Sequence, residues 1–176
     1  KANPAREGLS RLASLGSCFD TATVAEIEMA LAAGATADRI SFGNTIKKER
    51  DIARAYALGI RLFAVDCAAE VEKIARAAPG AKVFCRILYD CAGAEWPLSR
   101  KFGCDPEMAV EVLDLAKRVG LEPYGISFHV GSPQRKVKAW DRALAMAATV
   151  FRDCAQRGIN LSMVNPGGRF PPNSLK

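Results

Sequence analysis

Polar residues follow most of the β-like runs of this sequence, at positions where a buried core would want apolar side chains. They are Asp20, Asn44, Asp66, His129 with Gly131-Ser132, and Asn165 with Gly167-Gly168. A glycine and a hydroxyl directly after a strand can present hydrogen-bond donors to an anion, and His129-Val130-Gly131-Ser132 has that pattern. Gly167-Gly168 follows another strand in the same way. A plain turn explains either segment alone, but the two together favour one phosphate-bearing ligand.

The elements that would position these residues alternate between short β-like runs and longer helical runs. Strands are predicted at 17–20, 39–43, 61–65, 82–89, 122–130 and 160–164. Helices are predicted at 9–15, 23–33, 46–58, 68–77, 106–119 and 139–157, with a glycine-containing loop at 90–104. Such alternation predicts an α/β fold with a parallel sheet, in which ligands bind beyond the carboxyl ends of the strands. Periodicity allows a doubly wound sheet or a (β/α)8 barrel. A complete barrel needs about 250 residues, so a chain of 176 residues would supply part of one.

Composition and charge narrow the class of protein. The net charge is +6, but Lys and Arg alternate with Asp and Glu, as in 47–54, which is typical of a solvated helix face. The one dense basic segment, 134–138, has no interleaved aromatic residue and suits an anionic small molecule as well as a nucleic acid. Because the basic residues of the chain do not gather on one stripe, we expect no nucleic-acid partner. No apolar run is long enough for a membrane span, so we expect no membrane partner either.

Six cysteines and one histidine bear on metal and redox chemistry. No two cysteines form a Cys-x-x-Cys pair, and one histidine cannot complete a common zinc site, so we expect no metal. Most of the cysteines lie beside apolar residues, which predicts reduced thiols in a cytoplasmic protein.

Six short motifs occur in order along the chain. They are Lys1-Ala2-Asn3-Pro4, Cys18-Phe19-Asp20-Thr21-Ala22 with Glu26-Ile27, Ile40-Ser41-Phe42-Gly43-Asn44-Thr45-Ile46-Lys47, Ser99-Arg100-Lys101-Phe102-Gly103, Ser127-Phe128-His129-Val130-Gly131-Ser132 and Gly167-Gly168-Arg169-Phe170-Pro171. In this order and spacing they resemble the alanine-racemase-fold (fold type III) decarboxylases that depend on pyridoxal 5'-phosphate (PLP), specifically the ornithine decarboxylase branch. The resemblance covers nearly the whole chain.

The resemblance implies an incomplete TIM (β/α)8 barrel, with residues 1–176 forming strands two to seven of a PLP-binding domain. Strands one and eight and the C-terminal β-domain of the family would then lie outside this sequence. We therefore expect an internal fragment of a longer enzyme, inactive by itself, whose full-length parent is a homodimer. The end strands of such a fragment would be open edges.

The resemblance also implies roles for individual residues. Lys1 matches the lysine that carries the cofactor as a Schiff base, and His129 matches a histidine stacked on the pyridine ring; these two are the expected catalytic residues. Ser132 matches a phosphate contact, and Gly167-Gly168 match the glycine-rich phosphate loop. Asp20 and Glu26 match acidic positions near the Schiff base, and Asp20 is expected to contact the cofactor.

The implied reaction is decarboxylation of ornithine to putrescine in polyamine biosynthesis, with a small amino acid as substrate. The cofactor ring would accept the electrons left behind when carbon dioxide departs. Lysine or diaminopimelate as substrate fits the same fold. Two further alternatives are a catalytically silent homologue that binds a regulatory protein and an unrelated α/β binding domain.

The phosphate loop departs from the family pattern at two positions. Arg169 stands where the family has a third glycine, and Pro166 removes one backbone donor. The long side chain of Arg169 would either block close approach of the backbone to the phosphate or partly substitute for the lost contact through its charge; on balance we expect weaker phosphate binding than in the family. We predict that Arg169→Gly tightens cofactor binding, measured by titrating the parent protein with PLP; an unchanged affinity would contradict this.

Overall fold

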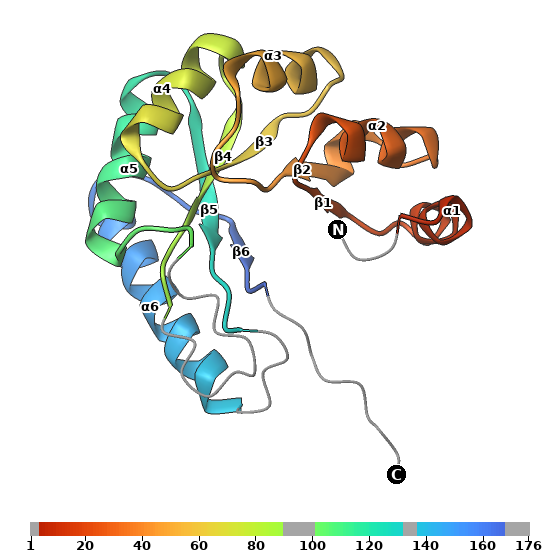
Figure 1. The fold of residues 1–176 in the computed structure, drawn as a ribbon. Helices are drawn as coiled ribbons and strands as arrows, with labels where there is room; N and C mark the ends of the chain where they lie inside the picture. Colours follow the sequence, from red (N-terminus) through yellow and green to blue (C-terminus); the bar gives the residue numbers. More distant parts are fainter. Residues whose placement is uncertain (1–3, 90–100, 132–136, 168–176) are drawn as a thin grey trace.

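The computed structural model describes residues 4–89, 101–131 and 137–167, and within them six parallel strands form one curved sheet (Figure 1). The strands are β1 (Phe19–Thr21), β2 (Ile40–Phe42), β3 (Leu62–Val65), β4 (Lys82–Arg86), β5 (Glu122–Ser127) and β6 (Met163–Asn165). Each strand pairs with the next one along the chain, so the order in space follows the order in sequence. A doubly wound sheet reverses its order partway, whereas a barrel adds strands in chain order. The predicted partial barrel is confirmed, with β1 and β6 as the end strands of the described sheet.

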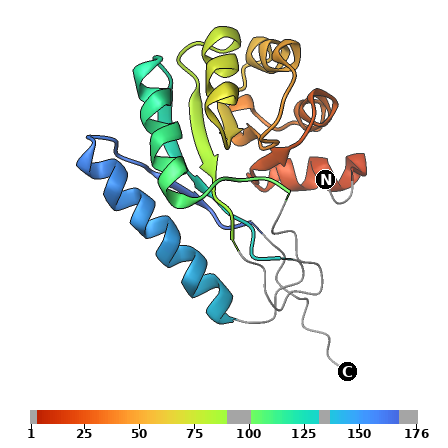
Figure 2. The ribbon, with the colours of Figure 1, turned by 60° about the vertical axis from the view of Figure 1, so that its left-hand side comes forward.

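Helices lie on the outer side of the curved sheet; the first precedes β1, and one α-helix follows each of the strands β1 to β5 (Figures 1 and 2). In the described ranges they are α1 (Arg6–Ser14), α2 (Val24–Ala32), the short 3-10 helix η1 (Ala37–Arg39), α3 (Glu49–Ala57), α4 (Ala68–Ala77), α5 (Pro106–Arg118) and α6 (Val137–Gln156). Each α-helix packs against the next one along the chain. None of these helices has both the length and the apolar character needed to cross a membrane.

Strand β4 shows how the two faces of the sheet differ. Successive residues of a strand point to opposite faces. Val83 and Cys85 are fully buried in the core shared with Leu113 of α5. Phe84 and Arg86, which alternate with them, line a cavity on the other face. The outward positions therefore hold the apolar core, while the inward positions are available for a site.

Two helices begin at a residue whose side chain caps the helix. Thr23 precedes α2, and its side chain accepts a hydrogen bond of 3.2 Å from the backbone N–H of Glu26. Asp105 does the same for α5 with the N–H of Met108, at 2.7 Å, and Pro106 occupies the first turn.

Five predicted boundaries are wrong by three residues. The helix expected from residue 9 begins at Arg6, the strand expected to reach residue 130 ends at Ser127, and the strand expected from residue 160 begins at Met163.

The other two boundaries have a visible structural reason. The helix expected from residue 46 begins at Glu49, because Lys47 turns inward and bonds to the loop after β2 and to β3. The strand expected to reach residue 89 ends at Arg86. Beyond it, Ile87 pairs with Cys104, so this stretch of chain takes a partner outside the sheet.

A buried group of charges fastens the loop after β2 to the neighbouring elements. The Lys47 ammonium lies 2.9 Å from Glu70 Oε1, and Lys73 Nζ lies 2.6 Å from Glu70 Oε2. Lys47 Nζ also donates to the carbonyl of Ala64 in β3, at 2.6 Å. The side chains of Lys47 and Glu70 are 0% and 3% exposed. Burial lowers the pKa of Lys47 to about 8, although the Glu70 carboxylate acts in the opposite direction.

We predict that Glu70→Gln lowers the free energy of unfolding by about 3 to 5 kcal/mol, because it leaves the Lys47 charge buried without its counter-charge. The matched control is Glu49→Gln, which breaks the exposed pair with Arg76 and should cost less than about 1 kcal/mol. Urea denaturation followed by circular dichroism measures both. Equal losses in the two variants would contradict the prediction.

Candidate functional site

The carboxyl ends of five strands surround one cavity of about 90 Å³. Its lining consists of Asp20, Gly43, Phe84, Arg86, Ser127, Phe128, His129, Asn165 and Gly167. Three residues expected to contact the cofactor, Asp20, His129 and Gly167, therefore meet at one place. Lys1, Ser132 and Gly168 lie outside the described residues, so their expected roles stay predictions.

Strand register explains why these side chains meet. Arg86 of β4 is the partner of Ser127 in β5, and Ser127 is the partner of Asn165 in β6. These three residues form one row across three neighbouring strands. Asp20 of β1 and Ser41 of β2 are partners in the same way and form a second row. Residues separated by tens of positions in the sequence are thus brought to the same level of the sheet.

The ring of His129 is held by the backbone just beyond β5. Its Nδ1 accepts a hydrogen bond of 3.0 Å from the N–H of Gly131. An imidazole nitrogen that accepts a hydrogen bond carries no proton, so the neutral ring carries its proton on Nε2. The bond fixes both the orientation of the ring and its tautomer. It also engages the Gly131 N–H, one of the donors expected to face an anion.

The backbone at Gly167 explains the need for glycine at the end of β6. Its φ is +45°, and a Cβ at this position would overlap the carbonyl of Phe128 in the chain after β5. The glycine therefore lets the ends of β5 and β6 approach each other closely. Its N–H donates to Asn165 Oδ1, at 3.2 Å. Like the N–H of Gly131, it bonds to a side chain two residues earlier.

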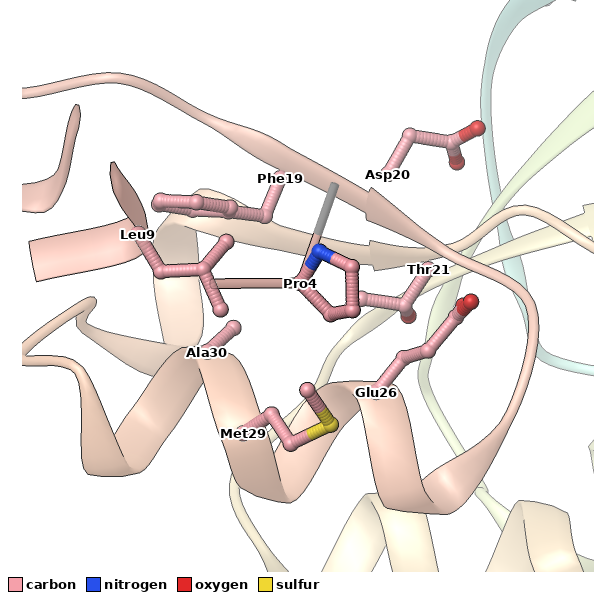
Figure 3. A pocket seen from close by; sticks show the side chains of 8 residues that line it. All are labelled: Pro4, Leu9, Phe19, Asp20, Thr21, Glu26, Met29 and Ala30. Carbon is pink, nitrogen blue, oxygen red and sulfur yellow. The ribbon is translucent and has the colours of Figure 1, made fainter. Parts of the chain in front are cut away.

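The acidic pair Asp20 and Glu26 lies near the start of the described chain. Both residues line a second, smaller cavity of about 50 Å³ together with Pro4 (Figure 3). Asp20 and Thr21 leave β1 in opposite directions, Thr21 towards α2 and Asp20 towards the other face (Figure 3). Glu26 Oε2 accepts a hydrogen bond of 2.5 Å from the N–H of Ala22. Glu26 thus closes the turn between β1 and α2.

Arg86 is a site residue that the sequence interpretation missed. It brings a permanent positive charge to the cavity, and its guanidinium lies 5.7 Å from the centre of the Phe102 ring. A signal was available, because arginine is rarely placed inside a buried strand without a partner or a function. Arg86 stands between Cys85 and Ile87, within a run that was interpreted simply as a strand.

Two other polar residues at strand ends hold loop segments and do not line this cavity. Asp66 Oδ2 accepts a hydrogen bond of 2.9 Å from the N–H of Gly103, which holds the segment carrying Phe102. The Asn44 amide donates to the carbonyl of Ile46, at 2.9 Å. A polar residue at the end of a strand therefore does not always belong to the site.

The cavity combines a planar imidazole, a guanidinium, a carboxylate and a hydroxyl. An imidazole held in one orientation can pack against a flat aromatic ring, and a guanidinium attracts anionic oxygens. The Asp20 carboxylate can face a positively charged amine. This set fits a planar, anionic cofactor that is joined to an amine. No group of three or more His, Cys, Asp or Glu side chains in the described ranges is arranged to hold a metal ion.

The fold and this site define a pyridoxal-binding barrel domain. Residues 1–174 match the family model described as "Pyridoxal-dependent decarboxylase, pyridoxal binding domain". The chain belongs to this family, as its motifs indicated.

Individual relatives agree with the family assignment. The chain is 37% identical to lysine/ornithine decarboxylase of Selenomonas ruminantium over its whole length and covers 45% of that protein. It is 32% identical to antizyme inhibitor 2 of Xenopus laevis, with 97% of this chain and 38% of that protein covered. Its structure matches arginine decarboxylase of Paramecium bursaria Chlorella virus, bound to agmatine, with a TM-score of 0.94 at 29% identity. That match covers 98% of this chain and 47% of the other. The chain thus spans less than half the length of these relatives.

We predict that Arg86→Met weakens PLP binding about 10- to 100-fold, because a hydrogen bond to a charged group contributes about 1.5 to 3 kcal/mol. Arg86→Lys, which keeps the charge, should lose less. Arg61→Met removes an arginine that stacks on Tyr56 away from the cavity and should bind PLP normally. Titration of the parent protein with PLP measures all three. Normal binding by Arg86→Met would contradict the prediction.

Proposed function

We propose that this chain is the cofactor-binding part of a PLP-dependent decarboxylase that converts ornithine to putrescine for polyamine biosynthesis. The observation that carries the proposal is the meeting of Asp20, Arg86 and His129 at the carboxyl ends of the strands in a chain of the pyridoxal-binding family. The similarity to a lysine/ornithine decarboxylase and to an arginine decarboxylase supports a basic amino acid as the substrate.

In the proposed reaction the described residues bind and orient. His129, with its Nδ1 held by Gly131, offers the flat face of a neutral imidazole to the cofactor ring. Arg86 attracts anionic oxygens into the cavity, and Asp20 balances the positive charge of an amine there. Lys1 is the proposed amine that carries the cofactor, by covalent catalysis. When bound, PLP accepts the electron pair that is freed as carbon dioxide leaves.

The choice among basic amino acids is the finer part of the proposal. Ornithine is preferred because the motifs resemble that branch of the family, and lysine or diaminopimelate is the alternative for the same fold. A catalytically silent regulatory homologue is the alternative from another class. The similarity to antizyme inhibitor 2 and the replacement of a glycine by Arg169 favour it, whereas Lys1 and His129, both present in this chain, favour the enzyme.

Two properties of the parent protein belong to the same proposal. The cysteines in the described ranges, Cys18, Cys67, Cys85, Cys104 and Cys154, are free thiols, which supports a reducing compartment such as the cytoplasm. A hydrogen bond to Cys104, together with burial, raises the pKa of the Cys85 thiol and keeps it protonated. We also propose that the parent is a homodimer, as the family resemblance implies.

The proposal predicts that the parent protein with PLP shows a visible absorption band that Lys1→Ala abolishes. A lysine amine bound covalently to the cofactor is required for that band. The exposed neighbour of the buried cluster, Lys48, provides the control, and Lys48→Ala should keep the band. Carbon dioxide release from ornithine, lysine, arginine and diaminopimelate then identifies the substrate. Absence of the band in the unmodified parent would reject the enzyme and favour the regulatory alternative.

A further inference from the structure

The position of the Asp20 carboxylate is set by two residues of the neighbouring part of the chain, Ser41 in strand β2 and Gly43 in the loop that follows it. Ser41 is its register partner on the neighbouring strand, and the Ser41 hydroxyl donates a hydrogen bond of 2.8 Å to Asp20 Oδ1. Because register partners on parallel strands point to the same face, this donor is fixed by the sheet itself. A flexible loop residue would offer no such constraint.

Gly43 is the second of these residues. Its N–H donates to the carbonyl of Thr21 at 2.7 Å, which holds the chain after β2 close to β1. A Cβ at Gly43 would lie 2.6 Å from Asp20 Cγ, closer than nonbonded carbon atoms come. The carboxylate therefore occupies the space that a side chain at residue 43 would fill. Any larger residue there would displace it.

We propose that Ser41 is a positioning residue that, with the space left by Gly43, aims the Asp20 carboxylate into the cofactor cavity. This inference rests on the proposed function, since the carboxylate needs a bound cofactor to act on. Asp20 borders the cavity that contains Arg86 and His129. A carboxylate held in one rotamer presents its charge at one point of that cavity without being reordered when the cofactor binds. Preorganisation of this kind increases affinity because less conformational freedom is lost on binding.

This positioning role also accounts for a polar residue, Ser41, at a strand position to which the proposed function assigns no other role. Position 41 is the middle of a three-residue strand between Ile40 and Phe42, which are both buried. Stability of the sheet would be served by a β-branched apolar residue at this point. Serine contributes little to packing, and its hydroxyl is directed at the one carboxylate that faces the cavity from β1.

The decisive experiment is a double-mutant cycle in the full-length parent protein, with PLP as the probe. The four proteins are the unmodified parent, Ser41→Ala, Asp20→Asn and the double variant. We expect Ser41→Ala to weaken PLP binding about 10-fold and to change the position or pH dependence of the visible band. In the Asp20→Asn background the same change should have little further effect, because Ser41 acts through Asp20.

Two further variants separate positioning from folding. Ser41→Thr keeps a hydroxyl on a strand-forming residue and should restore the affinity and the band. Ser14→Ala removes a hydroxyl that bonds to the Arg11 carbonyl on the exposed helix α1 and should bind PLP normally. The melting temperatures of Ser41→Ala and Ser14→Ala should be similar. A large decrease in the melting temperature of Ser41→Ala that Ser41→Thr does not reverse would overturn the positioning role.

The outcomes distinguish this inference from the function on which it rests. A visible band in the parent, with equal effects of Ser41→Ala in both backgrounds, would overturn the role of Ser41 and leave the proposed function intact. If the Ser41→Ala variant binds PLP as tightly as the unmodified parent, the role of Ser41 is likewise overturned and the proposed function stands. Absence of the band in the parent would overturn the proposed function and this inference together.

Discussion

Hydrogen bonding between parallel strands in chain order is the constraint on which the site depends. Parallel pairing brings the carboxyl ends of all strands to one edge, and register then decides which residues share a level. The row of Arg86, Ser127 and Asn165 and the row of Asp20 and Ser41 both follow from it. A slip of one residue in any strand would turn its polar side chain towards the helices. Because such a slip would also remove the apolar residues of the outer face from the core, their burial maintains the register that positions the polar residues of the inner face.

Several local interactions refine the arrangement that register sets up. The backbone of Gly131 holds the His129 ring, Gly167 allows two strand ends to come together, and Ser41 holds the Asp20 carboxylate. In each of these three interactions, a residue that need not contact the cofactor supplies either a hydrogen-bond donor or the space that a neighbouring group occupies. The buried pair Lys47–Glu70 fastens the loop that carries Gly43 and Asn44. Stability and site geometry are thus linked through the loop after β2.

Much of the architecture could be predicted, because strand–helix alternation is a local property of the sequence. The six strands and the helices between them were placed in the right order. Failures occurred where a tertiary partner replaced a local one. Lys47 left the helical pattern to bond to Ala64 and Glu70, and Ile87 paired with Cys104 instead of extending β4.

The sequence by itself determined the family and the fold class, because these depend on motifs and on periodicity. It also singled out four of the nine residues that line the cavity, Asp20, His129, Asn165 and Gly167. Only the tertiary structure decided which of the polar strand ends meet. Asp20, His129 and Asn165 line one cavity with Arg86, whereas Asn44 bonds to its own loop and Asp66 to the segment before α5. The physical reason is that strand register and the direction of each side chain arise from pairing between distant segments. A linear pattern does not contain that information.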